Sequence, residues 1–325
     1  ASAALTAGLT APVMKEVVRE RFMHYQVDAV HFTVLNDDEI SRYGEVEVMN
    51  TGPYDADRQP LPFGPLDKRL GCGSKSMTCD TCNCQLEDCV GHFGSLRLVL
   101  PVYHAGYFRH TMTTLQCVCK VCGRCLMRPE DQNRFLNRLR RPGTDDLQKS
   151  SLWKRVIELC KKIRTCPHCG SFNAQVKKGT GIPLIFKHTI PSKHTPGEIS
   201  QLFEESFADV RATNRDIEPF IDKANEDINP LDAYNLLRQM TPRDCELLGI
   251  VSPERLVMTT VPVPPVNIRP TVSMGDKGTR EDDLTGALGE IVEANNALQQ
   301  QMARGGQARQ VLEAWDFLQE KCATY

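Results

Sequence analysis

The sequence predicts a mixed α+β fold that is irregular and stabilised by bound metal. Of the 325 residues only 6% are aromatic and 20 are proline, so the hydrophobic core should be spread over several small units. Short stretches of helical and of alternating periodicity follow one another along the chain. Seven of the 14 cysteines, with one histidine, fall into two sets spaced like metal ligands. Metal binding should then replace part of the missing core.

The two ligand sets are the strongest signal in the chain. The first is Cys79-x2-Cys82-x6-Cys89-x2-His92, and the second joins Cys119-x2-Cys122 to Cys166-x2-Cys169 across 43 residues. Three thiolates with an imidazole, or four thiolates, fill the tetrahedral shell of Zn²⁺. A filled shell leaves no position for an activated water, so both zinc ions should be structural. The predicted fold is therefore zinc-stabilised.

Disulfide bonds are an alternative use of the cysteines. The two-residue spacings favour chelation, and the first ten residues lack the basic and apolar parts of a signal peptide. No run of about 18 apolar residues occurs, so we expect an intracellular, reduced protein with no membrane partner. Outside the two sets, Cys117 and Cys125 lie close enough to the second to compete with Cys119 as ligands.

The charge is distributed unevenly. The net charge is only −2, but residues 120–193 contain 17 Lys and Arg against 5 Asp and Glu. Such a run is ordinarily a solvated face. Because it surrounds the second ligand set, it is also typical of a surface that faces nucleic-acid phosphates. The candidate nucleic-acid contacts are Arg134, Arg138, Arg140, Arg141, Lys161, Lys162 and Arg164.

The first half of the chain predicts few regular elements. Residues 27–34 alternate like a strand, and Asn36 with Glu39 forms a capping box for a short helix that ends near Gly44. Residues 50–76 are rich in turn residues. Residues 96–108 predict a buried strand followed by a turn, and residues 152–163 predict a helix with a cationic outer side.

The second half begins with three similar helix starts, at Thr195, Asn229 and Thr241, each followed by a proline. The prolines of residues 261–270 predict an extended segment. It leads into a polar loop, which is either a projecting functional element or a connector. The last 45 residues predict an antiparallel helical hairpin with Gly305 and Gly306 at its tip, and this hairpin either packs in its own core or serves as a docking site.

Five stretches carry a resemblance to a known family. They are GPLDKRLG (64–71), CDTCNCQLEDCVGHFG (79–94), LPVYHAGYF (100–108), VPVPPVNIRPTV (261–272) and EDDLT (281–285). Together they resemble the N-terminal part of the largest subunit of multisubunit DNA-dependent RNA polymerases. The final EAWDFLQEKCATY (313–325) resembles RNA polymerase III in particular. The resemblance covers residues 27–325 and implies the clamp, a mobile module with zinc that closes over DNA and the RNA–DNA hybrid.

The resemblance also implies an organisation of the chain. We expect an N-terminal segment (1–26), a clamp head with two zinc sites and a basic surface (27–193), a region of short helices (194–260), a proline strut with a lid-like loop (261–281) and the clamp coiled coil (282–325). The eight ligands match the two clamp zinc sites of the family. The lid, which helps to separate RNA from template, is represented by Ser273, Met274, Lys277 and Arg280. At the hairpin tip, Arg304 and Arg309 are candidates for docking initiation and elongation factors.

Catalysis is expected to lie outside this sequence. The family binds two catalytic Mg²⁺ ions through an Asn-Ala-Asp-Phe-Asp-Gly-Asp motif, which is absent here; the nearest arrangement is Asp55-Ala56-Asp57. No residue of the chain is therefore predicted to be catalytic, and Mg²⁺ belongs to the assembled nucleotidyltransferase. The chain, which begins with Ala1, is expected to be a segment or natural split of a longer nuclear subunit. Its expected partners are the other polymerase III subunits, the DNA template and the hybrid, and the expected products are small RNAs such as tRNA and 5S rRNA.

Other function classes remain open. A metal-dependent hydrolase is disfavoured because the histidines form no His-Glu-x-x-His pair. A free-standing adaptor that binds zinc and DNA would show the same ligand sets and the same basic run. The clamps of polymerase II and of archaeal polymerases are further alternatives within the family.

Overall fold

The computed structural model describes residues 26–30, 32–75, 77–179, 184–189, 197–213, 218, 220–221, 227–273 and 279–325. The chain divides into two units, Ala1–Thr33 and Val34–Tyr325. In the first unit the described residues form neither helix nor strand, and Val27, Val30 and Phe32 are largely exposed. The predicted strand over 27–34 is therefore wrong, because alternating side chains form a strand only when another strand pairs with them.

The second unit is a mixed α+β structure, as predicted, and it opens with a helix that is specified locally. Helix α1 (Asp37–Tyr43) begins at the capping box of Asn36 and Glu39 and ends at Gly44, which confirms the prediction. Residues 50–76 then run through turns, with a single 3-10 turn at Lys68–Leu70 within their described part.

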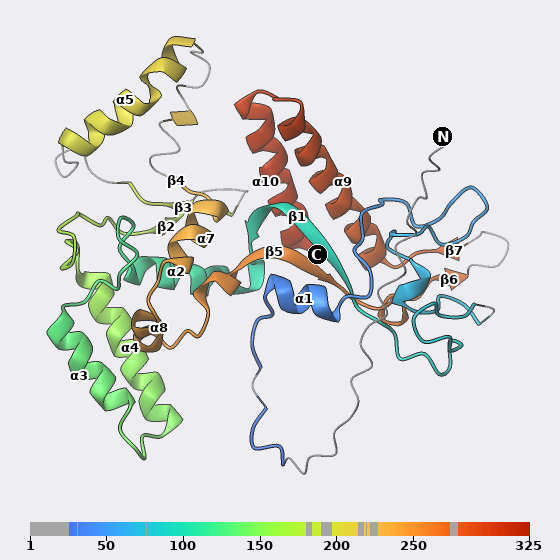
Figure 1. Cartoon of the computed structure of the whole chain (residues 1–325), viewed down its shortest axis with the longest axis horizontal. Coiled ribbons are helices and arrows are strands. Elements are labelled where there is room, and N and C mark those ends of the chain that lie inside the picture. Colours follow the sequence, from blue (N-terminus) through green and yellow to red (C-terminus); the bar gives the residue numbers. More distant parts are fainter. Residues whose placement is uncertain are drawn as a thin grey trace, which may run out of the picture. The chain divides into compact units, whose positions relative to one another are not determined.

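A long two-stranded sheet lies at the centre of the second unit (Figure 1). Strand β1 (Gly94–Tyr103) pairs antiparallel with β5 (Val257–Val263), with Gly94 opposite Val263 and Arg97 opposite Thr260. The register shifts between Arg97 and Val102, where Pro101 has no N–H to donate. The strand predicted over 96–108 therefore ends at Tyr103. A 3-10 turn (Ala105–Tyr107) and helix α2 (Phe108–Cys117) follow it.

Strand β1 contributes to two separate hydrophobic cores. Near its start, Leu96 packs with Val261 of β5 and with the C-terminal helices. At its end, Tyr103 packs among α2, α3 (Pro129–Leu139), α4 (Asp146–Lys162), α7 (Pro230–Arg238) and α8 (Pro242–Leu248). The core is thus divided, as the low aromatic content predicts.

The helix starts predicted by proline and a capping residue are confirmed where the structure describes them. Asn229 caps α7 and Thr241 caps α8, each by accepting a hydrogen bond from a backbone N–H. Helix α5 (Gly197–Thr213) matches the third start, but Thr195 and Pro196 lie outside the described residues. Helix α4 covers the predicted 152–163 helix up to Lys162, with Ile163 as its C-cap, but it begins earlier, after the cap Asp145.

The strut is extended only in part. Strand β5 ends at Val263, and Val266–Ile268 form a 3-10 turn where no proline restrains the backbone. The next residue, Arg269, is fully buried and donates to the carbonyl oxygens of Pro264 and Pro65 and to Thr285 Oγ1. Arg269 thereby links the proline strut to the loop that contains Pro65 and to the helix that contains Thr285.

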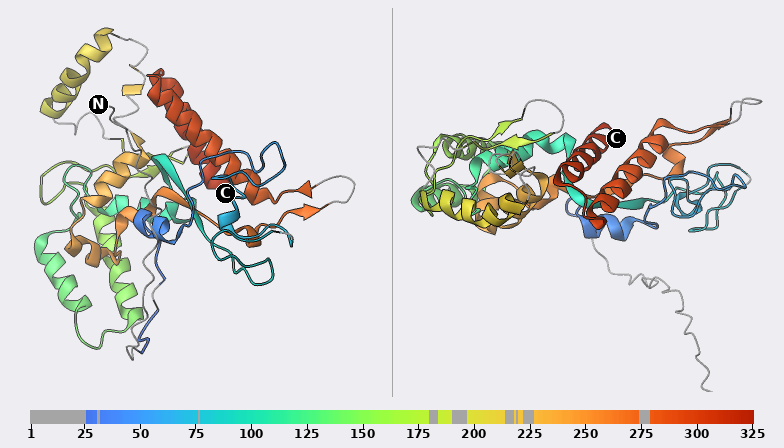
Figure 2. Two further views of the ribbon diagram at one scale, coloured as in Figure 1. Left: turned by 45° about the vertical axis from the view of Figure 1, so that its right-hand side comes forward. Right: turned by 90° about the horizontal axis from the view of Figure 1, so that it is seen from above.

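Short strands complete the sheets. Strands β6 (Val272–Ser273) and β7 (Thr279–Arg280) pair antiparallel and extend from the N-terminal end of α9 (Figure 2). The loop that they would hold, with Met274 and Lys277, lies outside the described residues. A separate sheet joins β2 (Lys177–Lys178), β3 (Phe186–Lys187) and β4 (Asp227–Ile228).

Two C-terminal helices occupy the predicted positions. Helices α9 (Asp283–Ala303) and α10 (Ala308–Thr324) pack side by side and bury Leu288, Ile291, Leu298 and Leu318 (Figure 1). The apolar seam does not reach the tip, because Met302 is 45% exposed. In the part of the chain that the structure describes, no helix is both long enough and apolar enough to cross a membrane.

Candidate metal centres and basic surface

Three Cys-x2-Cys hooks share one backbone geometry. In each hook the residue after the second cysteine donates its N–H to the carbonyl of the first, at 2.8 Å (Asn83 to Cys79), 3.0 Å (Gly123 to Cys119) and 2.9 Å (Gly170 to Cys166). The first cysteine in turn donates its N–H to a carbonyl five residues later, in Cys84, Arg124 and Ser171 respectively. The residues after the hooks have φ between 57° and 72°, which glycine adopts freely and asparagine tolerates. The repeated turn directs both sulfur atoms of a hook to one point.

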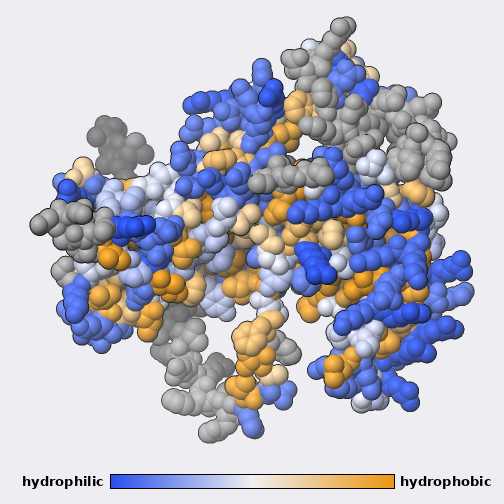
Figure 3. Space-filling model, turned by 180° about the vertical axis from the view of Figure 1, so that it is seen from behind, coloured by the Kyte–Doolittle hydropathy of each residue, from blue (hydrophilic) through white to orange (hydrophobic). Residues whose placement is uncertain are grey.

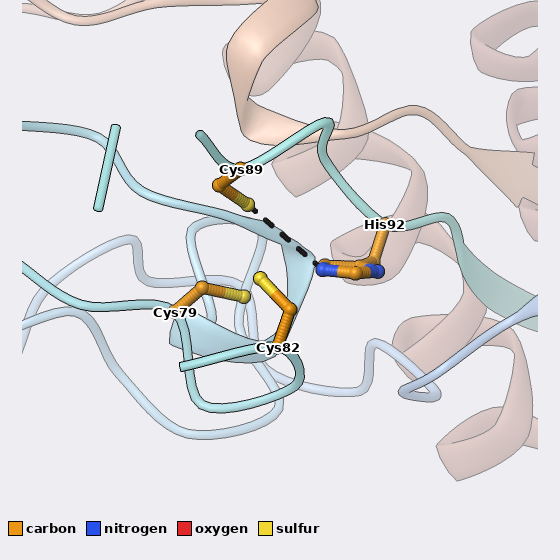
Figure 4. A group of neighbouring side chains, drawn as sticks. All are labelled: Cys79, Cys82, Cys89 and His92. Carbon is orange, nitrogen blue, oxygen red and sulfur yellow. Dashed lines mark hydrogen bonds between the residues drawn. The ribbon is translucent and has the colours of Figure 1, made fainter. Parts of the chain in front are cut away.

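The first hook meets Cys89 and His92 in the first candidate centre (Figure 4). All four ligand atoms lie within 4.8 Å of one another, and Cys89 Sγ is 3.9 Å from His92 Nε2. Cys79 and Cys89 are buried, whereas Cys82 and His92 are half-buried. The hydrogen bond with His92 is the main reason that the pKa of Cys82 is lowered to about 6, which favours the thiolate that a metal binds.

Neighbouring segments hold this centre from two sides. His92 donates its N–H to the carbonyl of Leu70 at 3.1 Å, and Asn267 donates its side-chain amide to the carbonyl of Cys89 at 2.7 Å. Gly91 has a φ of 82°, and a Cβ there would lie 2.5 Å from Pro265. The proline strut therefore lies directly against the ligand loop and requires glycine at this position.

The second candidate centre joins the other two hooks. Cys119 and Cys169 Sγ atoms are 3.6 Å apart, as are those of Cys122 and Cys166, and all four lie within 4.8 Å. A tetrahedron with Zn–S bonds of about 2.3 Å has edges of about 3.8 Å, so the spacing fits a zinc shell. The structure brings Cys119 and neither Cys117 nor Cys125 into this set, as predicted.

The groups that surround the second centre could not be identified from the sequence. Asn173 donates its side-chain amide to Cys119 Sγ at 3.3 Å and accepts a hydrogen bond from the N–H of Lys120 at 3.0 Å. Lys120 itself turns inward and donates to the carbonyls of Leu115 and Val118. Burial lowers the pKa of Lys120 to about 8. A four-thiolate zinc centre would carry a charge of about −2, so the inward-facing ammonium of half-buried Lys120 offsets part of that charge.

The predicted basic residues are all exposed, but they do not form one patch. Helices α3 and α4 pack side by side and are joined by residues 140–145, so Lys161 and Lys162 lie at the opposite end of the pair from Arg138 and Arg141 (Figure 1). Seen from behind, the surface of the α3 and α4 region is mostly hydrophilic (Figure 3). Arg134 lies on α3 about 6 Å along the axis from Arg138, and Arg164 follows α4.

Arg140 differs from the other candidates because it is already paired. Its guanidinium group binds the carboxylate of Glu246 on α8 with distances of 2.6 and 2.8 Å. Within the described part of the chain, Arg134, Arg138 and Arg141 have no such ion pair. These three side chains are therefore the freer cations of the α3 region.

Two hydrogen bonds hold the base of the lid-like loop. Glu281 follows β7 and accepts hydrogen bonds from Tyr54 Oη and Thr271 Oγ1, both at 2.6 Å. Ser273 lies in β6, and Arg280 in β7 is exposed and 3.8 Å from Asp283. The pairing of Tyr54 with Glu281 is not evident from the sequence, because the two residues lie 227 positions apart.

The docking candidates lie where the two C-terminal helices meet. Arg304 is the C-cap of α9 and is exposed. Arg309 is also exposed and forms a 2.7 Å ion pair with Glu313 one turn further along α10. Arg304 is therefore the less constrained of the two cations.

Comparison with known proteins places the chain. Residues 24–325 match the family model described as RNA polymerase Rpb1, domain 1. The human DNA-directed RNA polymerase III subunit RPC1 is 36% identical over 321 residues, and the subunit from Saccharomyces cerevisiae is 37% identical over 329 residues. Each alignment covers 96% of this chain, and the covered shares of the relatives are 23% and 22%. The archaeal subunit Rpo1N from Methanocaldococcus jannaschii is 27% identical over 304 residues, which are 92% of this chain and 20% of the relative.

The chain thus spans less than a quarter of the length of these curated relatives. Its match to the family model nevertheless extends over almost the whole sequence, including both ligand sets and the two C-terminal helices. The resemblance to the RNA polymerase largest-subunit family is confirmed, and the chain belongs to the RNA polymerase Rpb1 domain 1 family.

Proposed function

We propose that the chain is the clamp region of the largest subunit of RNA polymerase III, which closes over DNA and the RNA–DNA hybrid during transcription. The observation that carries the proposal is the identity of 36–38% to RPC1 subunits of animals and fungi over 96% of the chain. The archaeal relative is clearly less similar, at 27%. This difference favours polymerase III over an archaeal clamp.

Two structural Zn²⁺ ions hold the region together. Cys79, Cys82, Cys89 and His92 would bind one ion, and Cys119, Cys122, Cys166 and Cys169 the other. The ligand types and the sulfur spacing fit this metal. When bound, each ion supplies cross-linking energy between distant segments and no catalysis, because all four positions belong to protein.

The exposed cations of the α3 and α4 region contact nucleic acid. Arg134, Arg138 and Arg141 form one group, and Lys161, Lys162 and Arg164 form another at the opposite end of the helix pair. Two separated groups suit a duplex, whose phosphates repeat along an extended path. Arg140 contributes less, because Glu246 already binds its guanidinium group.

The C-terminal part of the chain has two further roles. The loop carried by β6 and β7, with Ser273, Met274, Lys277 and Arg280, acts as the lid that keeps RNA apart from the template. The tip of α9 and α10, with Arg304 and Arg309, docks initiation and elongation factors. Exposed Met302 and Leu312 beside these cations would give such a partner apolar contacts.

Nucleotide addition takes place in the assembled enzyme. The aspartates that hold Mg²⁺ belong to polypeptide outside this sequence, so the chain acts with other polymerase III subunits in the nucleus. Its contribution there is to retain DNA and to position the hybrid while tRNA and 5S rRNA are made.

A site-specific cross-linker tests the nucleic-acid surface directly. Asn137 is exposed on α3, next to Arg138 and about one turn after Arg134. A photo-reactive amino acid at Asn137, in the assembled polymerase halted on a DNA template, should form covalent links with the DNA. The control carries the same photo-reactive amino acid in place of Glu205, an exposed residue of α5. Equal DNA cross-linking from both positions, or none from Asn137, would contradict the proposed surface.

A further inference from the structure

Three cysteines outside both metal centres meet in the core beside the second centre. Cys117 lies at the end of α2, Cys125 follows the hook of Cys119 and Cys122, and Cys160 lies in α4. All three are completely buried. The Sγ atoms of Cys125 and Cys160 are 3.5 Å apart, which is van der Waals contact. Cys117 belongs to the same buried cluster as this pair.

These three thiols do not form a third metal centre. Among the described residues, the sets of three or more candidate ligands within 4.8 Å of one another are the two centres above. Cys117, Cys125 and Cys160 are therefore not mutually close enough to surround an ion. A reaction that needs only two sulfur atoms is still possible between Cys125 and Cys160, whose Sγ atoms are in contact.

We propose that Cys125 and Cys160 are a modification site at which oxidation forms an intramolecular disulfide bond. A disulfide has an S–S distance of about 2.05 Å, so the two sulfur atoms need to approach by about 1.5 Å. Small rotations of two side chains supply such a movement. Because the thiols are held in contact, their reaction is effectively unimolecular and precedes reactions with more distant cysteines.

The reaction balances with a peroxide as oxidant. One sulfur attacks an oxygen of hydrogen peroxide, the O–O bond breaks, and a sulfenic acid and one water form. The second sulfur then attacks the sulfenic sulfur, an S–S bond forms and the second water leaves. Two thiols thus give two electrons to the peroxide, and their two protons end in water.

The surroundings keep the pair reduced until an oxidant enters. Hydrogen bonds with Cys117 and Cys125, together with burial, raise the pKa of Cys160, so its thiol stays protonated. The pair should therefore oxidise more slowly than an exposed thiol but more completely than an isolated buried one. The disulfide would join the hook of the second centre to α4 immediately before Lys161 and Lys162.

Mass spectrometry of the full chain loaded with zinc tests the assignment. The chain is treated with hydrogen peroxide, denatured in iodoacetamide and a chelator, and digested with trypsin without reduction. Trypsin places Cys117, Cys125 and Cys160 in three different peptides, 110–120, 125–134 and 156–161. The expected product is 125–134 joined to 156–161, two hydrogens lighter than the separate peptides and released by a thiol reductant.

Variants and internal controls identify the pair. Cys117→Ala should leave the linked product, whereas Cys125→Ala and Cys160→Ala should each remove it while the chain still binds two zinc ions. Cys245, in the same core but outside the contacting pair, and Cys322, in the other core, should be recovered alkylated. Recovery of Cys125 and Cys160 as separate alkylated peptides would overturn the proposal. A product that joins Cys160 to Cys117, or to a zinc ligand, would overturn it as well.

Discussion

The guanidinium group of Arg124 lies 3.2 Å from the carboxylate of Asp244, a residue 120 positions further along the chain. Arg124 belongs to the first hook of the second centre, and Asp244 lies at the start of α8. Thr241 donates to the same carboxylate oxygen at 2.7 Å. The ion pair therefore fastens the metal centre to the helices that follow it.

Removal of the Arg124 charge should destabilise the unit. Asp244 is completely buried, and its Oδ1 atom has no hydrogen-bond partner within the described part of the chain. Without Arg124 the buried carboxylate would lose its only described ion pair, so Arg124→Met should lower the free energy of unfolding by about 1–3 kcal/mol. Urea unfolding of the chain loaded with zinc measures this change. Arg128→Met, at an exposed position four residues away, is the matched control, and an equal effect of both substitutions would remove the special role of Arg124.

Loss of a ligand should release one zinc ion and no more. Cys82→Ser and Cys122→Ser should each lower the zinc content by one ion per chain and unfold the surrounding loop, because metal binding in a closed centre is coupled to folding. Cys84→Ser is the control, since Cys84 lies in the same loop but outside the ligand set. Metal analysis with melting curves distinguishes them. Two zinc ions retained in Cys82→Ser would contradict the first centre.

The free arginines of α3 should govern the salt dependence of DNA binding. Neutralisation of Arg138 should weaken binding and reduce the slope of log K against log salt by about one. The double variant Arg140→Gln, Glu246→Gln removes a pair that is already neutral overall, so its slope should stay near that of the parent chain. Binding isotherms at several salt concentrations measure both slopes. The same slope for all three proteins would return Arg138 to the class of solvated surface charges.

The hydrogen bond from Tyr54 to Glu281 should make stability fall at alkaline pH. Burial is the main cause that raises the pKa of Tyr54 above its ordinary value of 10.0, and the hydrogen bond with Glu281 is the second. A raised pKa means that this stabilisation is present below pH 10 and is lost as the pH rises through the folded-state pKa. Tyr54→Phe should cost about 1 kcal/mol at pH 8 and should flatten the decline above pH 10. Thermal melting at pH 8 and at several pH values above 10 measures both effects. If the stability of the variant falls above pH 10 as steeply as that of the parent chain, another group causes the decline.

A shortened lid should affect RNA and leave the fold intact. Deletion of residues 275–277 removes loop residues between β6 and β7 and touches neither metal centre. In the assembled polymerase, RNA should then stay paired with the template over a longer stretch, which nuclease mapping of the hybrid detects. A hybrid of normal length in an active enzyme would remove the lid assignment from this loop.

The structural features that could be predicted from the sequence are those that depend on neighbours along the chain. The hooks are two-residue spacings, and the caps at Asn36, Asn229 and Thr241 act within one helical turn. Both kinds of feature are confirmed. The strand predicted over 27–34 is wrong because its alternation had to be paired with a distant segment, and the structure provides none over its described residues.

Features that depend on distant segments could not be predicted. Tertiary packing decides which groups meet. Examples are the ion pair of Arg124 with Asp244, the hydrogen bond from Tyr54 to Glu281 and the hydrogen bonds that Lys120 donates to backbone carbonyls. The neutralisation of Arg140 by Glu246 is of the same kind, and it changes which predicted nucleic-acid contact is free. The function was predicted from the resemblance to a polymerase family, because capping and periodicity indicate local structure and not function.

Membership of RNA polymerase III is tested most directly by the native mass and subunit content of the assembly that this chain enters. The chain would be captured from a nuclear extract through a tag at its N-terminus. We expect a multisubunit particle that contains the other RNA polymerase III subunits and incorporates ribonucleotides on a DNA template. A monomer or small dimer that binds zinc but incorporates no nucleotides would contradict it, and would make the chain a free-standing binding module.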